Sequence, residues 1–238
     1  MMLEIENLNT FYGAVHALRD ANLTVSEGET VALLGRNGMG KSTTLKSIMG
    51  LAKPRTGTIN FEGQSIFGYP PFKVAKSGIA YVPEERRIFP NLTVLDNLSM
   101  GMKTGDKRKI KDENRWPLER VYKHFPILAE RTNQNAITLS GGEQQMLTIA
   151  RSLMGNPSLI LVDEPTEGLS PGMTREVRDI LAEIAKTGVA ILFVEHNLKV
   201  AMSLADRIYL MGKAHLGFEG TVAELEAQPE IRAKYLEV

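Results

Sequence analysis

Short apolar runs alternate along this chain with segments whose apolar residues recur at helical spacing. Residues 3–8 (LEIENL) and 21–35 (ANLTVSEGETVALLG) predict strands, with EGE as a turn signal in the second segment. Residues 43–51 (TTLKSIMGL) then follow a helical pattern, and residues 53–66 return to short strands with glycine turns. The first part of the chain is therefore predicted to run strand, glycine loop, helix and strand again.

The middle of the chain changes character. From residue 118 onward, one predicted helix face carries the apolar residues Val121, Tyr122, Phe125 and Leu128. A helical lobe is therefore expected to be inserted here. Residues 103–115 hold six basic and three acidic side chains, and we interpret them as a solvated surface of this lobe rather than a nucleic-acid patch.

Continuous apolar runs return in the last part of the chain. Residues 158–165 (SLILVDEP) and 189–197 (VAILFVEHN) stay apolar until their final polar residues, and the helix-like segment 173–186 separates them. Another helical pattern starts at Leu198. Strands that are apolar throughout and alternate with helices are typical of a parallel sheet covered on both faces.

Composition narrows the class of protein. The 238 residues are 43% hydrophobic and 24% charged, enough for one large domain or a domain with an inserted lobe. Basic and acidic residues number 28 each, so no global charge would attract nucleic acid. Without cysteine there is neither a disulfide framework nor thiolate catalysis. The first residues lack a signal-peptide pattern and the apolar runs are too short to cross a bilayer, so we expect a soluble, cytoplasmic chain.

The segment GRNGMGKST carries the first chemical motif. Residues 35–42 fit G-x-x-x-x-G-K-[ST] between a predicted strand and a predicted helix. Such a loop points successive backbone N–H groups at phosphate oxygens. Lys41 is expected to bridge the β- and γ-phosphates of ATP, and the Ser42 hydroxyl to bind Mg²⁺. The alternative is a glycine turn with a surface lysine. The predicted nucleotide-binding residues here are Gly35, Asn37, Gly38, Met39, Gly40, Lys41, Ser42 and Thr43.

Two carboxylates end the apolar run LILVDEP. The carboxyl edge of such a strand is where ligands bind in open α/β sheets. Asp163 is expected to hold Mg²⁺ and Glu164 to act as general base on the water that attacks the γ-phosphate. A solvated acidic loop end is the alternative, and the glycine loop favours the metal site.

Two further side chains are candidates for the same site. His196 also follows a buried strand, so it can hydrogen-bond the γ-phosphate or the attacking water, although a lone histidine is more often structural. Tyr12 can stack its ring on adenine, a contact that typically contributes ~1–3 kcal/mol. A tyrosine of the core or surface is the alternative for Tyr12.

A second glycine-rich segment, LSGGEQQ at residues 139–145, starts a predicted helix. Together with GRNGMGKST, LILVDEP and the histidine after FVE, it resembles the ATP-binding subunits of ABC transporters, from residue 3 to the end of the chain. The resemblance implies ATP sandwiched in a head-to-tail dimer between the first loop of one chain and the Ser-Gly-Gly of the other. The residues offered to the partner's ATP are Ser140, Gly141, Gly142 and Glu143. Ser140 and Glu143 also form a capping box, and both roles are compatible.

The resemblance also implies the fold and domain organisation. The expected fold is α/β, a P-loop NTPase of the ABC type with a mostly parallel core sheet, an antiparallel β subdomain and an inserted helical lobe. The whole chain, 1–238, is expected to form one ATP-binding domain. Residues 1–84 and 156–238 would form the ATPase core with the β subdomain, and residues 85–155 the helical subdomain.

Two positions depart from the family pattern. Glu84 stands where the family usually has a glutamine that ligates Mg²⁺, and a carboxylate can still do so. Ser170 stands where the family has an aspartate of the dimer contact, which puts signalling through that residue in doubt. Together with the segment VPEERRIFPNLTVLDNL, these two residues make the chain similar to the smaller ATPase of branched-chain amino-acid uptake systems.

That subgroup implies partners and a location. The chain is expected to lie peripherally at the cytoplasmic face of the inner (plasma) membrane, bound to two integral membrane permease subunits and to a second ATPase or another copy of itself. A substrate-binding protein would be an indirect partner, and nucleic acid would not be one. The alternatives are an exporter ATPase of the lipopolysaccharide-extraction type, a soluble ABC ATPase of ribosomes or DNA repair, and a non-hydrolysing regulatory module. The presence of Glu164 argues against the last of these.

Overall fold

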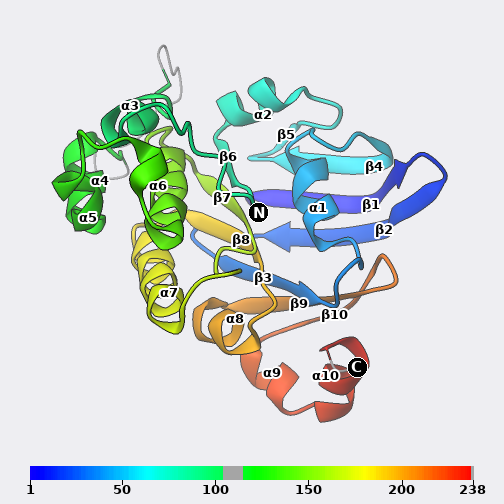
Figure 1. The fold of residues 1–238 in the computed structure, drawn as a ribbon. Coiled ribbons are helices and arrows are strands. Elements are labelled where there is room, and N and C mark those ends of the chain that lie inside the picture. The colour runs from blue at the N-terminus through cyan, green and yellow to red at the C-terminus, as the bar shows by residue number, and fades with distance from the viewer. Residues whose placement is uncertain (104–114, 237–238) are drawn as a thin grey trace.

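Two β-sheets organise the chain in the computed structural model, which describes residues 1–103 and 115–236 (Figure 1). The smaller sheet is antiparallel, with the strand order β2-β1-β4-β5. Its strands are β1 (Leu3–Tyr12), β2 (Val15–Val25), β4 (Pro54–Phe61) and β5 (Gln64–Ser65). The strands predicted at residues 3–8 and 53–66 are confirmed as parts of this sheet.

The larger sheet is the predicted parallel core. Its order is β10-β9-β3-β8-β7-β6, and every neighbouring pair from β9 to β6 is parallel, whereas β10 pairs antiparallel with β9. The strands are β3 (Thr30–Gly35), β6 (Ile79–Val82), β7 (Leu159–Asp163), β8 (Ala190–Val194), β9 (Arg207–Gly212) and β10 (His215–Gly220). All residues of β3, β7 and β8 are buried, as strands covered on both faces must be.

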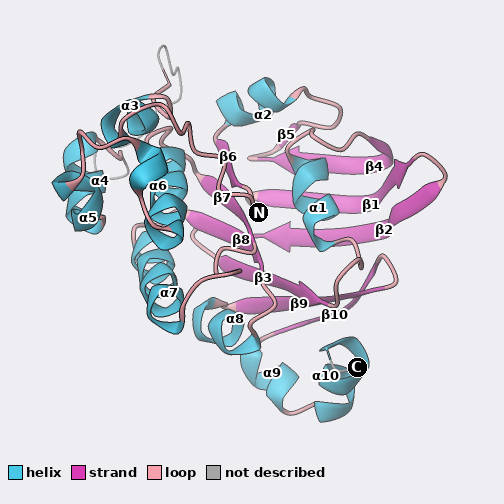
Figure 2. Ribbon diagram, in the orientation of Figure 1, coloured by secondary structure: helices cyan, strands magenta, loops and turns pink. Residues whose placement is uncertain are grey.

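Alternate residues of the core strands enter two separate hydrophobic cores, because successive side chains of a strand point to opposite faces. Val31 and Leu33 of β3 pack in the same core as Leu45 and Ile48 of helix α1 and the apolar residues of the antiparallel sheet. Ala32 and Leu34 enter the other core, with helices α6, α7 and α8. The core sheet is therefore sandwiched between the small sheet with α1 on one side and a helical layer on the other (Figure 2).

The helices of the described chain fall into two groups. Those of the core are α1 (Lys41–Ile48), α2 (Pro71–Ser77), α7 (Pro171–Lys186), α8 (Leu198–Leu204), α9 (Val222–Glu226) and α10 (Pro229–Leu236). The helices gathered at one end, away from the small sheet, are α3 (Val94–Ser99), α4 (Leu118–His124), α5 (Pro126–Glu130) and α6 (Gly141–Leu153), with a 3₁₀ turn at Ala136–Thr138 (Figure 1). No helix within residues 1–103 and 115–236 is long and apolar enough to span a membrane.

The helix face predicted around residues 118–128 is divided between two helices. The chain breaks at Phe125, whose φ of −128° and ψ of 68° are not helical, because the following Pro126 disfavours the helical conformation of the residue before it. Val121, Phe125 and Leu128 are nonetheless all fully buried in one core. Of the basic segment 103–115, residues 104–114 lie outside the described residues. The division into core and helical subdomains at residues 84 and 156 stays a prediction.

Gly57 of β4 occupies a position where only glycine fits. Its φ is +104°, and a Cβ there would lie 2.6 Å from the Asn7 carbonyl oxygen and 2.7 Å from the Glu6 carbonyl oxygen. These atoms belong to the irregular stretch of β1 between Glu6 and Asn9, where the register with β4 shifts. Backbone atoms cannot move aside cheaply, so the small sheet depends on this glycine.

Replacing Gly57 with Ala is therefore expected to lower the free energy of unfolding by about 3 kcal/mol, since it adds steric clash to backbone strain. Chemical denaturation measures this change. Gly63→Ala is the matched control, because Gly63 has a φ of +74° but no atom within 4 Å of a new Cβ. It should cost only about 1 kcal/mol. Equal losses in the two variants would contradict the packing argument.

Candidate functional site

A cleft of about 830 Å³ opens at the carboxyl end of the core strands. Several predicted side chains meet there although they are far apart in sequence: the loop after β3, and the residues that follow β6, β7 and β8. The predicted residues lining the cleft are Tyr12, Asn37, Gly38, Met39, Gly40, Lys41, Ser42, Thr43, Glu84, Glu164 and His196. Its lining does not include Gly35, Asp163, Ser140, Gly141, Gly142 or Glu143.

The glycine loop wraps the start of α1. Gly40 has a φ of +107°, and a Cβ there would lie 2.6 Å from the Ala17 carbonyl oxygen, so the tight passage into the helix requires glycine. Lys41 is only 4% exposed and its Nζ donates to the Arg36 carbonyl oxygen at 3.1 Å across the loop. The first N–H groups of α1 have no acceptor within the helix, so the loop and helix together suit an anion.

Asp163 closes strand β7 and is 1% exposed. Its Oδ2 accepts a hydrogen bond of 2.8 Å from the Tyr81 hydroxyl, whereas its Oδ1 is buried and has no hydrogen-bond partner among the described residues. A buried carboxylate oxygen without a partner is costly, so the site fits a cation or its bound water beside Oδ1. Burial lowers the pKa of Lys41, and the nearby charges of Glu164 and Asp163 oppose part of this shift.

Glu164 and His196 form the central pair of the cleft. Glu164 Oε1 lies 2.6 Å from His196 Nε2, and the glutamate is 9% exposed with a φ of +48°. Burial, followed by the hydrogen bond that protonated Glu164 donates to Glu167, raises the pKa of Glu164 to about 8. Burial and the charge of Lys41 lower the pKa of His196. Both pKa shifts favour the neutral forms. Near pH 7 the proton of the pair is therefore on the Glu164 carboxyl group, and His196 is uncharged.

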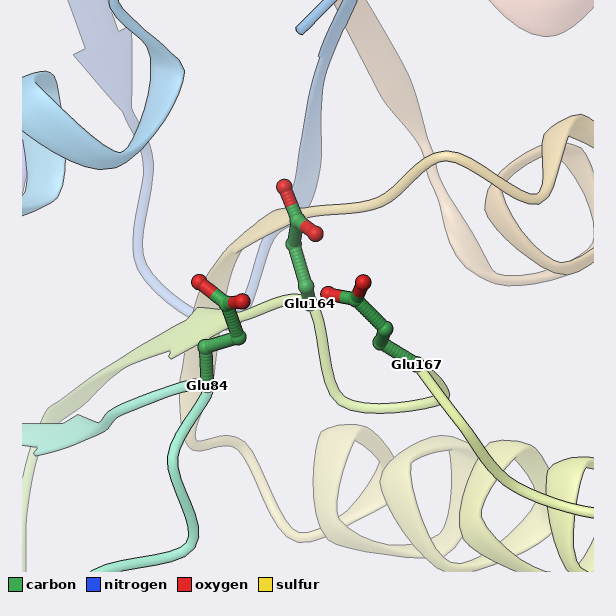
Figure 3. A group of neighbouring side chains, drawn as sticks. All are labelled: Glu84, Glu164 and Glu167. Carbon is green, nitrogen blue, oxygen red and sulfur yellow. The ribbon is translucent and has the colours of Figure 1, made fainter.

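Three carboxylates gather beside this pair. Oxygens of Glu84, Glu164 and Glu167 all lie within 4.8 Å of one another, and Figure 3 shows their side chains extending from the ends of β6 and β7 into one space. Burial and the nearby charges of Glu167 and Asp163 raise the pKa of Glu84. Oxygen donors at this density are what a hard divalent cation prefers. The residues present therefore fit Mg²⁺.

The cleft also contains residues that the sequence patterns did not identify. They are Val15, His16, Ala17, Arg19, Glu167, Lys213, Ala214 and His215. The last three lie at the tip of the β9–β10 hairpin, which a backbone hydrogen bond of 2.9 Å from Arg19 N to the Ala214 oxygen joins to β2. Glu167 follows the predicted pair Asp163–Glu164 by only a few residues. Of the residues that the sequence patterns missed, it is therefore the one that a sequence signal could have indicated.

Tyr12 lies at the rim of the cleft, where β1 ends. Its side chain is 50% exposed, so the ring is free to meet a planar ligand. The neighbouring Phe11 stacks on His16 with 4.0 Å between ring centroids, and the Arg55 guanidinium covers the Phe11 ring at 4.1 Å. This stack fixes the hairpin that carries Tyr12.

Ser140 caps helix α6, as predicted. The Ser140 N–H donates to Glu143 Oε2 at 2.7 Å, and the Glu143 N–H donates to Ser140 Oγ at 3.4 Å. The Arg86 guanidinium lies beside Gly141, where a Cβ would come within 2.5 Å of Nη1. The start of α6 does not line the cleft of its own chain.

Comparison with known proteins gives the same family throughout. The family model described as ABC transporter matches residues 18–167. The chain is 40% identical over 235 residues to the high-affinity branched-chain amino acid transport ATP-binding protein BraG of Pseudomonas aeruginosa, covering 99% of both chains. It is 37% identical to the probable branched-chain amino acid transport ATP-binding protein LivF of Archaeoglobus fulgidus, covering 94% of both. It is 33% identical to the lipopolysaccharide export system ATP-binding protein LptB of Haemophilus influenzae, covering 99% of this chain and 97% of LptB.

Solved structures agree with these matches. A nucleotide-free ATP-binding cassette of an ABC transporter superposes with a TM-score of 0.82 at 26% identity, covering 97% of this chain and 96% of that one. A dimeric cassette in a post-hydrolysis state, bound to ADP and Pi, superposes with a TM-score of 0.80 at 27% identity, covering 93% and 99%. The predicted ABC-type P-loop fold is thereby confirmed. The chain belongs to the ABC transporter family, as an ATP-binding subunit that hydrolyses ATP.

Proposed function

We propose that the chain powers the import of branched-chain or other hydrophobic amino acids, or of a related small amide or carboxylate, from the cytoplasmic face of the plasma membrane. The observation that carries this proposal is the near-complete coverage at 40% and 37% identity with BraG and LivF, against 33% with LptB. Glu84 and Ser170, which depart from the general family pattern, support the same subgroup.

In the proposed site, ATP lies along the cleft with its base near Tyr12 and its phosphates on the loop from Gly35 to Thr43. Buried Lys41 would hold the β- and γ-phosphates, since its ammonium is already directed into the loop at Arg36. Ser42, Asp163 and Glu84 would hold Mg²⁺, which when bound neutralises developing charge on the phosphate oxygens. The unpartnered Oδ1 of Asp163 supports this assignment.

Glu164 is the proposed general base. Its carboxylate would take the proton of the attacking water, and His196, 2.6 Å away, would hold that carboxylate in place and orient the water and γ-phosphate. Because the pKa of Glu164 is raised, the pair must lose its carboxyl proton before Glu164 can accept another.

The pH dependence of hydrolysis follows from that requirement. A raised carboxyl pKa leaves Glu164 protonated below about pH 8, so kcat/KM is expected to rise by about tenfold per pH unit between pH 6 and 7 and to level off above 8. Initial rates of phosphate release at low ATP concentration measure this profile. In Glu164→Gln the titrating group is gone, and the residual rate should be flat over the same range. A flat profile in the unchanged protein would contradict the base assignment.

The proposed assembly is a head-to-tail dimer with a second ATPase or with another copy of this chain. Ser140, Gly141, Gly142 and Glu143 would then face the γ-phosphate bound by the partner. Two features support this: the start of α6 stands outside its own chain's cleft, and the related cassette bound to ADP and Pi is dimeric. In this arrangement ATP binds the closed dimer better than the open one and so drives closure.

Two permease subunits are the proposed membrane partners, with a substrate-binding protein as an indirect partner. The proposed dock lies in the region after Glu84, between the core and the helical lobe. Exposed apolar side chains support it: Phe72 on α2 is 66% exposed, and Met100 and Met102 after α3 are 60% and 49% exposed. Lys103 Nζ donates to the Ala75 oxygen at 2.7 Å, which brings these two elements side by side. Exposed apolar side chains on neighbouring elements are typical of a protein interface.

Copurification tests the proposed function. The tagged chain is extracted from native membranes in mild detergent, and mass spectrometry identifies its stoichiometric partners. Two distinct permeases and a second ATPase would support the importer. Lipopolysaccharide-export components would favour the second candidate, for which the 33% identity with LptB is the specific support. Ribosomes or DNA-repair proteins would overturn both.

A further inference from the structure

Tyr81 is the one neighbour that holds the carboxylate of Asp163 by a hydrogen bond among the described residues. It stands on β6, parallel to β7, with Tyr81 opposite Leu161 in the register. Side chains two residues apart on a strand share a face, so Tyr81, Leu161 and Asp163 all point to the side of the sheet where α1 packs. From there the Tyr81 hydroxyl reaches forward to Asp163 Oδ2 at 2.8 Å.

The two oxygens of Asp163 are thereby made different. Oδ2 accepts the tyrosine proton, whereas Oδ1 is buried and accepts no hydrogen bond from any described residue. A carboxylate held by one oxygen cannot rotate freely about its last bond, so the direction of the other oxygen is fixed as well. The oxygen left over is the one that a cation would need, on the side of the sheet where α1 begins with Ser42 next to Lys41.

We propose that Tyr81 is a positioning residue for the metal site: its hydroxyl occupies Oδ2 of Asp163 and directs Oδ1 at the Mg²⁺ of bound nucleotide. The inference rests on the proposed role of Asp163 as a metal ligand. Tyr81 also precedes Glu84 by three residues, so the same strand end carries both the positioning hydroxyl and the second carboxylate ligand.

The hydroxyl is a dependable donor. A phenolic hydroxyl keeps its proton throughout the physiological range, so Tyr81 can donate to Asp163 Oδ2 as the 2.8 Å contact requires. Its role requires no proton transfer and no contact with the nucleotide, because Tyr81 does not line the cleft.

The test is Tyr81→Phe, which removes one oxygen and keeps the ring. Mn²⁺ serves as the probe, and electron paramagnetic resonance measures its binding to the complex of the full chain with ADP. Hydrogen-bonded partners of metal ligands typically change metal affinity by 10–100-fold, so we expect Mn²⁺ to bind about tenfold more weakly. ADP affinity measured in EDTA should be unchanged. In steady-state hydrolysis, the Mg²⁺ concentration for half-maximal rate should rise while the rate at saturating Mg²⁺ changes by less than about twofold.

Tyr209→Phe is the matched control. Tyr209 is a buried tyrosine of the same sheet whose hydroxyl accepts a hydrogen bond of 2.7 Å from Arg207, away from the cleft. It should bind Mn²⁺ as the unchanged protein does. Thermal unfolding in EDTA checks that both variants fold. If the Phe variant does not fold, Tyr81→His, which restores a ring N–H donor, is compared with the unchanged protein. A folded His variant whose Mn²⁺ affinity is within threefold of that of the unchanged protein upholds the inference.

The outcomes separate the inference from the proposed function. Unaltered Mn²⁺ affinity in a folded Tyr81→Phe variant would overturn the positioning role and leave the nucleotide site standing. Weaker ADP binding in EDTA would also overturn it, because the effect would then act on the nucleotide rather than the metal. Failure of the unchanged protein to bind Mn²⁺ with ADP would overturn the proposed magnesium site and this inference with it.

Discussion

Replacing Glu164 with Gln is expected to lower the rate of ATP hydrolysis by about 100-fold or more while ATP binding persists. The amide has the size and shape of the carboxyl group but cannot accept the proton of the attacking water. It can still hydrogen-bond His196, whose Nε2 lies 2.6 Å from Glu164 Oε1. Because the carboxyl is already largely neutral before ATP binds, its replacement changes little in the charge of the free site.

The stalled variant should also accumulate as a dimer with Mg·ATP, which light scattering detects, because in the proposed assembly ATP binding closes the dimer and hydrolysis reopens it. Phosphate release and the fluorescence of a nucleotide analogue give the rate and the affinity. Glu167→Gln is the control, since Glu167 belongs to the same carboxylate cluster but leaves the Glu164 carboxylate intact. Its rate should fall by less than about tenfold. If the Glu167 variant is stalled and the Glu164 variant stays active, the general base is Glu167 rather than Glu164.

The parallel core could be predicted because its strands are buried on both faces. Segments such as LILVD and AILFV are apolar at nearly every position, and in a chain with alternating helices such short runs are typical of strands in a covered parallel sheet. The glycine loop and the residues after each strand then had to meet at one edge of the sheet, so most of the predicted residues do line one cleft.

The rest of the site depends on contacts that no local pattern encodes. Lys213, Ala214 and His215 reach the cleft only because β9 pairs with β3 and the β9–β10 turn meets β2. No sequence motif includes Tyr81, and its hydrogen bond to Asp163 exists only because β6 lies next to β7 in this register. Glu167 differs from these residues, because it lies close to Glu164 in the sequence and a local turn, closed by its N–H on the Glu164 carbonyl oxygen at 3.2 Å, returns it to the cluster.

The helix that starts at Ser140 is also tied to the loop after Glu84. The Thr148 hydroxyl donates to the Arg86 carbonyl oxygen, and Arg151 Nη2 donates to the Arg87 carbonyl oxygen at 2.8 Å. Arg86 and Arg87 both have positive φ, a conformation that costs energy in non-glycine residues and that these bonds to α6 help to hold. Any movement of Glu84 on nucleotide binding would therefore be passed to α6, and with it to the residues proposed to face the partner's ATP.

Complementation between two inactive chains tests that two-chain site most directly. Lys41→Ala removes the buried ammonium from the phosphate loop and is expected to lower hydrolysis by about 100-fold or more. Gly141→Glu is expected to do the same from the other side, by placing a carboxylate where the partner's γ-phosphate is proposed to bind. It should not unfold the chain, because acidic residues suit the first turn of a helix and the atom nearest to a new Cβ is the movable end of Arg86.

Mixing the two inactive chains should restore activity if the site is shared head to tail. In a mixed dimer, one site combines both changes, while the other pairs the intact Lys41 of one chain with the intact Gly141 of its partner. Random pairing makes half of the dimers mixed, so hydrolysis should return to about a quarter of the unchanged level. The control is a chain carrying both changes, mixed with the unchanged chain. Each site of such a mixed dimer contains one of the two changes and is inactive. The expected quarter of the activity then comes only from dimers of two unchanged chains. If dimers form but the two single variants do not complement, each ATP is served by one chain alone and the start of α6 has only its capping role.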